Sequence, residues 1–73
     1  MKTEIWFENI KLKNANLKEI AKTIAEVLSL REDEVLVTDV RENILVVDIL
    51  RKTITVKQII GKKNELLRRL SQI

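Results

Sequence analysis

Two apolar runs separated by three polar residues limit what this chain can fold into more than any other feature. The first run spans residues 35–40 and the second spans residues 44–50, with Arg41, Glu42 and Asn43 between them. Both runs are rich in β-branched residues, which favour strands, and so short a connection fits only a tight turn. The sequence therefore predicts an antiparallel hairpin.

The second strand of this hairpin is apolar on both of its faces. Because side chains alternate along a strand, Leu45, Val47 and Ile49 share one face, and Ile44, Val46 and Leu50 share the other with Asp48. We expect the first face to pack on helices. The second face is then left for an N-terminal arm that carries Trp6, or for a second subunit.

Helical spacing of apolar residues begins at Asn16 and predicts a helix over residues 16–29. Asn16 and Glu19 have the spacing of a capping box at its start. Thr55 and Gln58 have the same spacing, which predicts a short helix over residues 56–60. Residues 31–34 form the acidic link between the first helix and the hairpin.

Residues 4–12 carry both aromatic side chains and suit a strand or an extended arm. The predicted fold is a small two-layer α+β domain in the order β-α-β-β-α(-α), with the hairpin packed on the helices. We expect one domain over residues 1–73, made of an arm at 1–13 and a core at 14–73. The shared core is predicted to contain Ile24, Leu28, Leu45, Val47, Ile49 and Leu67.

The only glycine, Gly61, marks a break in hydrophobic phase between residues 56 and 72. In one unbroken helix, Lys63 would fall within the apolar stripe, where its charge is costly to bury. A helix that ends at Gly61, with glycine free to adopt positive φ, and restarts with Asn64 as N-cap leaves Lys62 and Lys63 in an exposed turn. A continuous helix with Lys63 snorkelling outwards is the alternative.

Positive charge is concentrated at the C-terminal end of the chain. Residues 1–50 hold seven Lys/Arg and ten Asp/Glu, whereas residues 51–73 hold seven and one. Such a cluster is the electrostatic footprint of a polyanion partner, and backbone N–H groups at a helix start attract phosphate. The candidate nucleic-acid-binding residues are Gly61, Lys62, Lys63, Asn64, Arg68 and Arg69. A basic helix that is merely solvated is the alternative.

The segment Ile59-Ile60-Gly61-Lys62-Lys63-Asn64, followed by an amphipathic stretch, resembles the Ile-Gly-x-x-Gly loop of the KH domain. The predicted element order over residues 16–72 is similar to the type II KH arrangement. This resemblance implies RNA binding at the loop. Asn64 stands where the family has its second glycine, and no final strand follows residue 72. Residues 4–12 or a partner chain would have to supply the third strand.

The chain has 73 residues, no cysteine and no histidine, so disulfides, thiolate metal sites and histidine chemistry are excluded. We expect no enzyme activity and no cofactor. The carboxylates near turns are expected to be solvated: Glu32, Asp33, Glu34, Asp39, Glu42 and Asp48. Apolar runs are too short to cross a membrane, which predicts a cytoplasmic protein. Abundant charged and β-branched residues with no proline are typical of a heat-adapted protein.

Two function classes follow. The first is a non-catalytic module that binds RNA or another polyanion, with weak sequence preference because aromatic residues are scarce. The second is a protein-interaction, homo-oligomerisation or small-ligand regulatory module with a truncated ferredoxin-like βαββα fold. Such a short chain builds only a thin core, so we expect an oligomer. A break at Gly61 favours the first class, and a continuous helix favours the second.

Overall fold

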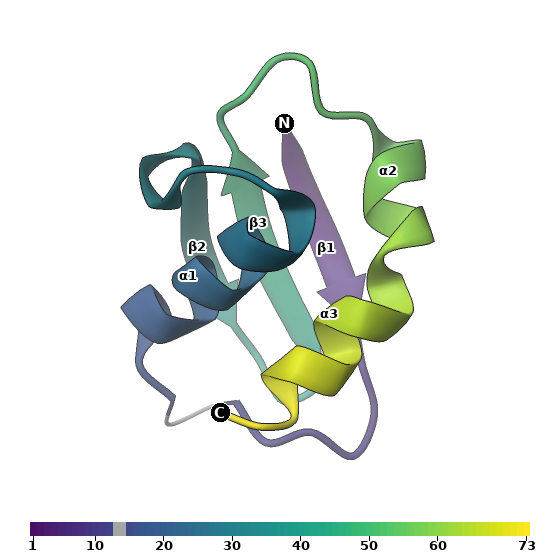
Figure 1. Cartoon of the computed structure of the whole chain (residues 1–73). Helices are drawn as coiled ribbons and strands as arrows, with labels where there is room; N and C mark the ends of the chain where they lie inside the picture. Colours follow the sequence, from purple (N-terminus) through teal and green to yellow (C-terminus); the bar gives the residue numbers. More distant parts are fainter. Residues whose placement is uncertain (13–14) are drawn as a thin grey trace.

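The computed structural model describes residues 1–12 and 15–73, and over them the chain forms a two-layer α+β domain (Figure 1). The elements are β1 (Lys2–Trp6), α1 (Leu17–Leu28), a 3-10 turn η1 (Glu32–Glu34), β2 (Val35–Val40), β3 (Ile44–Ile49), α2 (Val56–Gly61) and α3 (Lys63–Leu70). The predicted boundary between an arm at 1–13 and a core at 14–73 falls on residues outside the described ones. The α+β class and the element order are as predicted.

The sheet is antiparallel and has the strand order β1-β3-β2. The predicted hairpin forms β2 and β3, and Arg41 N donates to Ile44 O at 2.8 Å across its turn. A bulge interrupts β2 at Thr38, whose Oγ1 donates to Val46 O at 3.2 Å. The elements thus follow the predicted order β-α-β-β-α, and a further helix, α3, comes after α2.

The predicted strand over residues 4–12 is wrong in its bounds, because β1 covers Lys2–Trp6. After β1, Phe7 N still donates to Asn43 O at 3.1 Å. Asn9 then adopts a left-handed conformation with φ 60°, which asparagine tolerates, and the strand does not continue. The N-terminal segment thus supplies the third strand from within the chain. It joins the sheet at its edge and does not lie over its face.

Helix α1 confirms the predicted helix at residues 16–29 to within one residue at each end. Asn16 is its N-cap, and its side chain accepts from Lys18 N at 2.8 Å. Within the described part of the chain, Glu19 does not complete the predicted capping box. Ser29 ends the helix in a left-handed conformation with φ 58°, and its N–H bonds back to the last turn.

The core lies between the sheet and the helices, and Figure 1 shows α1 and α3 in front of the sheet with α2 beside β1. The predicted core residues Ile24, Leu28, Leu45, Val47 and Ile49 are buried. Leu67 was wrongly assigned to the core, because it is only partly buried whereas Leu66 and Leu70 are fully buried. Leu66 and Leu70 are four residues apart and share the buried face of α3, whereas Leu67 lies at the margin of that face.

The other face of the sheet has no helix over it among the described residues. Trp6 lies opposite Ile44 in the ladder and is 52% exposed, and Leu36 on β2 is 54% exposed. Ile44 and Val46 are half-buried between them. This outer face is therefore partly apolar and open to solvent.

Candidate nucleic-acid interface

The candidate interface begins with α2, whose start is fixed by a reciprocal cap. Thr55 Oγ1 accepts from Gln58 N at 3.2 Å, and Gln58 Oε1 accepts from Thr55 N at 2.8 Å. This is the capping box that the sequence predicts. The cap fixes Val56 as the first residue of α2.

The predicted break between two helices is present, and its centre is Lys62. Lys62 has φ −105° and ψ 5°, outside the helical range. Its N–H donates to Ile59 O at 3.1 Å, and its carbonyl accepts from Leu66 N at 2.9 Å. Lys62 is therefore both the C-cap of α2 and the N-cap of α3.

Gly61 does not have the conformation that we predicted for it. It is the last residue of α2, and no glycine in the described residues has positive φ. A Cβ added at Gly61 would meet no atom within 4 Å. Neither backbone conformation nor packing therefore requires glycine here.

Asn64 is not the N-cap of α3, contrary to the prediction, because that helix already begins at Lys63. Asn64 lies in the first helical turn with its side chain exposed. The N–H groups of the first turn of a helix have no partner within that helix, and they carry its positive dipole end. The start of α3 thus adds partial positive charge beside the lysines, and the negative dipole end of α2 at Gly61 offsets part of it.

Lys62 and Lys63 are both exposed, as predicted, but they border different hollows. Lys62 lines a hollow of ≈ 240 Å³ beside Ser29 at the end of α1. Lys63 lines a groove of ≈ 210 Å³ beside β1. The two lysines therefore do not line a common hollow among those described.

The two predicted arginines are held by carboxylates. Arg68 Nε donates to Glu65 Oε2 at 3.1 Å, and this side-chain hydrogen bond lowers the pKa of Glu65. Arg69 Nη2 donates to Glu26 Oε2 at 2.6 Å, which ties α3 to α1. A phosphate would have to compete with these carboxylates. Arg68 and Arg69 are thus weaker candidates than the lysines.

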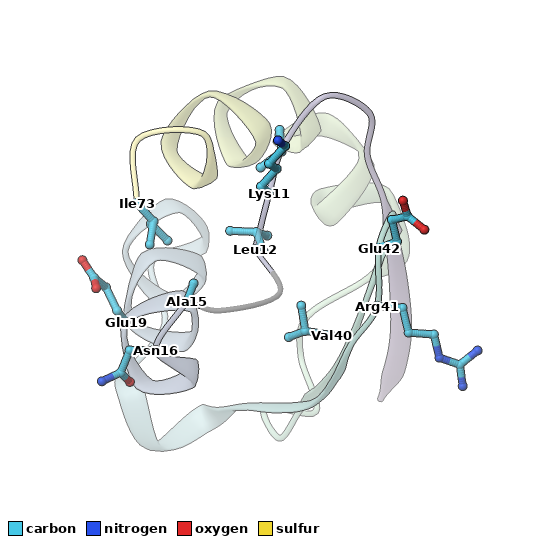
Figure 2. Close-up of a pocket in the computed structure, with 10 residues that line it drawn as sticks. Lys11, Leu12, Ala15, Asn16, Glu19, Val40, Arg41, Glu42 and Ile73 are labelled. Atoms are coloured by element: carbon cyan, nitrogen blue, oxygen red, sulfur yellow. The ribbon is translucent and has the colours of Figure 1, made fainter.

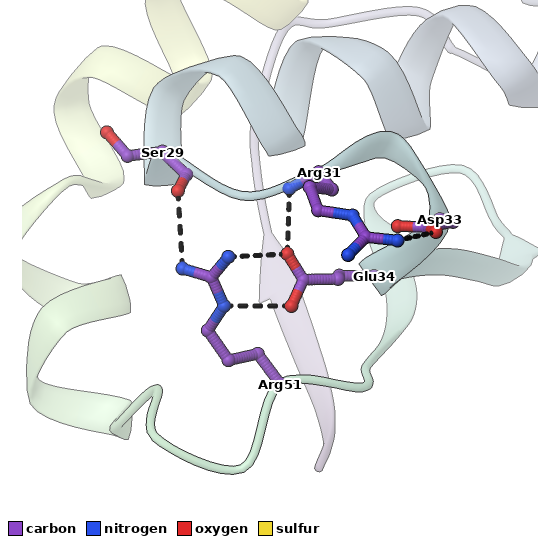
Figure 3. Close-up of polar contacts among 5 residues, drawn as sticks. All are labelled: Ser29, Arg31, Asp33, Glu34 and Arg51. Carbon is purple, nitrogen blue, oxygen red and sulfur yellow. Dashed lines mark hydrogen bonds and ion pairs between the residues drawn. The ribbon is translucent and has the colours of Figure 1, made fainter.

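Arg51, the remaining arginine of residues 51–73, is also paired, in a cluster that sequence reasoning missed (Figure 3). Arg51 donates to both carboxylate oxygens of Glu34, at 2.8 and 2.6 Å, and to Ser29 O at 3.5 Å. Arg31 N donates to Glu34 Oε1 at 2.9 Å. The hydrogen bonds from the Arg51 side chain, then from the Arg31 backbone, hold the pKa of Glu34 below its ordinary value.

Four lysines in residues 51–73 remain without a partner. Within the described part of the chain, no carboxylate lies within 4.0 Å of their ammonium groups. They are Lys52, Lys57, Lys62 and Lys63. The unpaired positive charge of this segment is therefore lysine charge, centred on α2 and the junction that follows it.

A hollow of ≈ 1050 Å³ lies between the segment before α1 and the hairpin turn (Figure 2). Figure 2 shows Leu12 and Val40 turned towards its interior, whereas Arg41 and Glu42 point away from it. Arg41 Nε also donates to Asp39 Oδ2 at 2.8 Å. The interior is thus apolar, and the charges of this hollow do not converge on a ligand.

Residues 1–12 and 15–73 contain neither a cluster of possible metal ligands nor a helix that could span a membrane. No group of three or more Asp, Glu, His or Cys side chains there could hold a metal ion. No helix in the described part of the chain is long and apolar enough to cross a bilayer. Comparison with models of protein families, with curated proteins and with solved structures found no match.

Proposed function

We propose that this chain is a small non-catalytic nucleic-acid-binding module that holds single-stranded RNA at the α2–α3 junction. The observation that carries the proposal is the pair of exposed lysines at a one-residue break between two helices. Counterion release from phosphates near such lysines supplies sequence-independent affinity. The likeness of residues 59–64 to a KH loop favours RNA over other polyanions.

The chemistry of the junction supports weak sequence preference. Lysine binds phosphate as a point charge, whereas arginine forms planar two-bonded contacts, and the arginines here are engaged with carboxylates. Trp6 is the one exposed aromatic residue of the described chain, and it lies on β1 beside Lys63's groove. Stacking can therefore involve few bases, and backbone contacts dominate.

The test is a titration of a fluorescent single-stranded RNA with the wild type and with a Lys62→Asp/Lys63→Asp variant. Both positions are exposed, so circular dichroism should show an intact fold. The matched control is Lys18→Asp/Lys22→Asp, which makes the same change in net charge at exposed positions on α1. We expect the junction variant to lose binding and the control to retain most of it. An equal loss of RNA affinity in both variants would show that net charge, and not the junction, determines binding.

A protein-interaction module is the second candidate, favoured by the uncovered outer face of the sheet. Its apolar side chains are Trp6, Leu36, Ile44 and Val46. A second copy meeting this face would bury them and enlarge a thin core. Light scattering tests pairing with a second copy: a dimer that Ile44→Lys converts to monomer supports it, and a monomeric wild type rejects self-association through this face.

A further inference from the structure

The backbone of β1 has hydrogen-bonding groups on its outer edge. Met1 N donates to Ile49 O at 2.6 Å, and Ile49 N donates to Met1 O at 2.8 Å. Bonded residues alternate along an antiparallel strand, so the N–H and C=O groups of Lys2, Glu4 and Trp6 point away from β3. No described strand pairs with that edge. The edge of β1 is therefore able to accept another strand.

An apolar groove of ≈ 210 Å³ lies between this edge and the helices. Its base contains the buried side chains of Ile5, Ile59 and Leu66. Its walls contain Val56, which is 52% exposed, and Ile60, which is 66% exposed. A cavity of about 150 Å³ admits benzene, so the groove has room for one large apolar side chain.

We propose that this edge and groove together dock an extended strand of a partner protein, antiparallel to β1. Edge hydrogen bonds would hold the strand, and alternate apolar side chains would enter the groove under Val56 and Ile60. The intervening side chains would lie on the outer face beside Lys2 and Glu4. Charge complementarity then requires an acidic residue opposite Lys2 and a basic residue opposite Glu4.

An extended segment fits this edge better than a second copy of the chain does. Figure 1 shows α2 running beside β1, so pairing two β1 strands would bring two α2 helices together over adjacent strands. Paired strands lie about 4.8 Å apart, whereas packed helices need about 8 to 10 Å. A strand without a flanking helix avoids this conflict. The proposal goes beyond nucleic-acid binding and does not depend on Lys62.

The probe is an acetylated peptide of sequence Thr-Val-Lys-Val-Glu, titrated into isotope-labelled protein and followed by NMR. In antiparallel pairing its lysine lies opposite Glu4, its glutamate lies opposite Lys2, and its valines face the groove. We expect saturable shifts and slower hydrogen exchange at the amides of Lys2, Glu4 and Trp6. Methylating the backbone amide nitrogen of the peptide's lysine should weaken binding about threefold to tenfold, because one main-chain hydrogen bond to the edge of β1 is lost.

The register is tested by exchanging charges on both partners. The peptide Thr-Val-Glu-Val-Lys should bind the wild type about twofold to fivefold more weakly. The Lys2→Glu/Glu4→Lys variant should invert this preference. Ile60→Asn should weaken both peptides, whereas Leu36→Asn, at a similarly exposed apolar position on β2, should not. Lys62→Asp should leave peptide binding unchanged, which separates this proposal from the RNA proposal.

The proposal is overturned if the peptide at millimolar concentration leaves the β1 amides unshifted, or if the charge preference does not invert. It is also overturned if light scattering shows a dimer in which those amides are already protected, because a second copy then occupies the edge.

Discussion

Arg51 and Glu34, 17 positions apart in the sequence, form a two-bonded ion pair at 2.8 and 2.6 Å (Figure 3). Glu34 also accepts from Arg31 N, and Arg51 reaches Ser29 O. The pair thus joins η1 to the start of the connection between β3 and α2. It fixes the start of the connection that leads to α2 and the candidate interface.

Because of this pair, the free energy of unfolding should depend on pH below the range in which a free glutamate titrates. The folded-state pKa of Glu34 is lowered, so its contribution is present above the unfolded pKa of about 4.3 and is lost as pH falls through the folded value. Melting temperatures should therefore fall less between neutral and acid pH in Glu34→Gln than in the wild type. Glu42→Gln is the control, since Glu42 has no ion-pair partner among the described residues. Parallel pH curves for the wild type and Glu34→Gln would contradict the assignment.

The leucines of α3 should differ in their effect on stability. Leu66 is 0% exposed, whereas Leu67 is only partly buried. Leu66→Ala should lower the free energy of unfolding by about 2 to 5 kcal/mol, as should Ile24→Ala in α1. Leu67→Ala should cost less, because its site is open to water. Urea denaturation measures these values, and an equal cost at the two leucines would mean that α3 is rotated.

Gly61→Ala separates a structural role of the glycine from a binding role. Gly61 has no positive φ and no neighbour that a methyl group would touch, so alanine should stabilise the fold by up to about 1 kcal/mol. If RNA phosphate approaches the backbone there, the same variant should bind RNA more weakly. Loss of stability in urea denaturation would show instead that the fold requires glycine at this position.

Asn64→Gly tests whether the side chain at the start of α3 obstructs a phosphate. Glycine within a helix costs up to about 1 kcal/mol relative to a good helix former, so stability should fall slightly. RNA affinity should rise, since the backbone becomes more accessible at an exposed position. An unchanged affinity, measured alongside Asn43→Gly as a surface control, would argue that phosphate does not contact this residue.

Local patterns were sufficient for most of the fold. Periodicity and the caps at Asn16 and Thr55 placed α1 and α2, and the β-branched runs placed the hairpin. Conformations that depend on tertiary context were not predicted. Among the described residues, Asn9 and Ser29 are left-handed, whereas Gly61 is helical.

The candidate site was predicted less completely than the fold. Exposure of Lys62 and Lys63 followed from the cost of burying an ammonium group. The partners of the arginines did not follow, because Glu26 lies 43 positions from Arg69 and Glu34 lies 17 from Arg51. Such pairs form only once α1, α3 and the connections have packed. The groove beside β1 also requires the tertiary fold, although Val56 and Ile60 at i, i+4 spacing were a signal for one of its walls.

The central claim is that Lys62 and Lys63 contact phosphates, and the salt dependence of RNA affinity tests it most directly. Affinity for a single-stranded RNA is measured at several salt concentrations for the wild type, Lys62→Ala/Lys63→Ala and the control Lys18→Ala/Lys22→Ala. Each lost phosphate contact removes about 0.7 from the slope of log affinity against log salt, so the junction variant should flatten it by about 1 to 1.5. The control should keep the wild-type slope. Identical slopes for the wild type and the junction variant, or no RNA binding by the wild type at low salt, would contradict the claim.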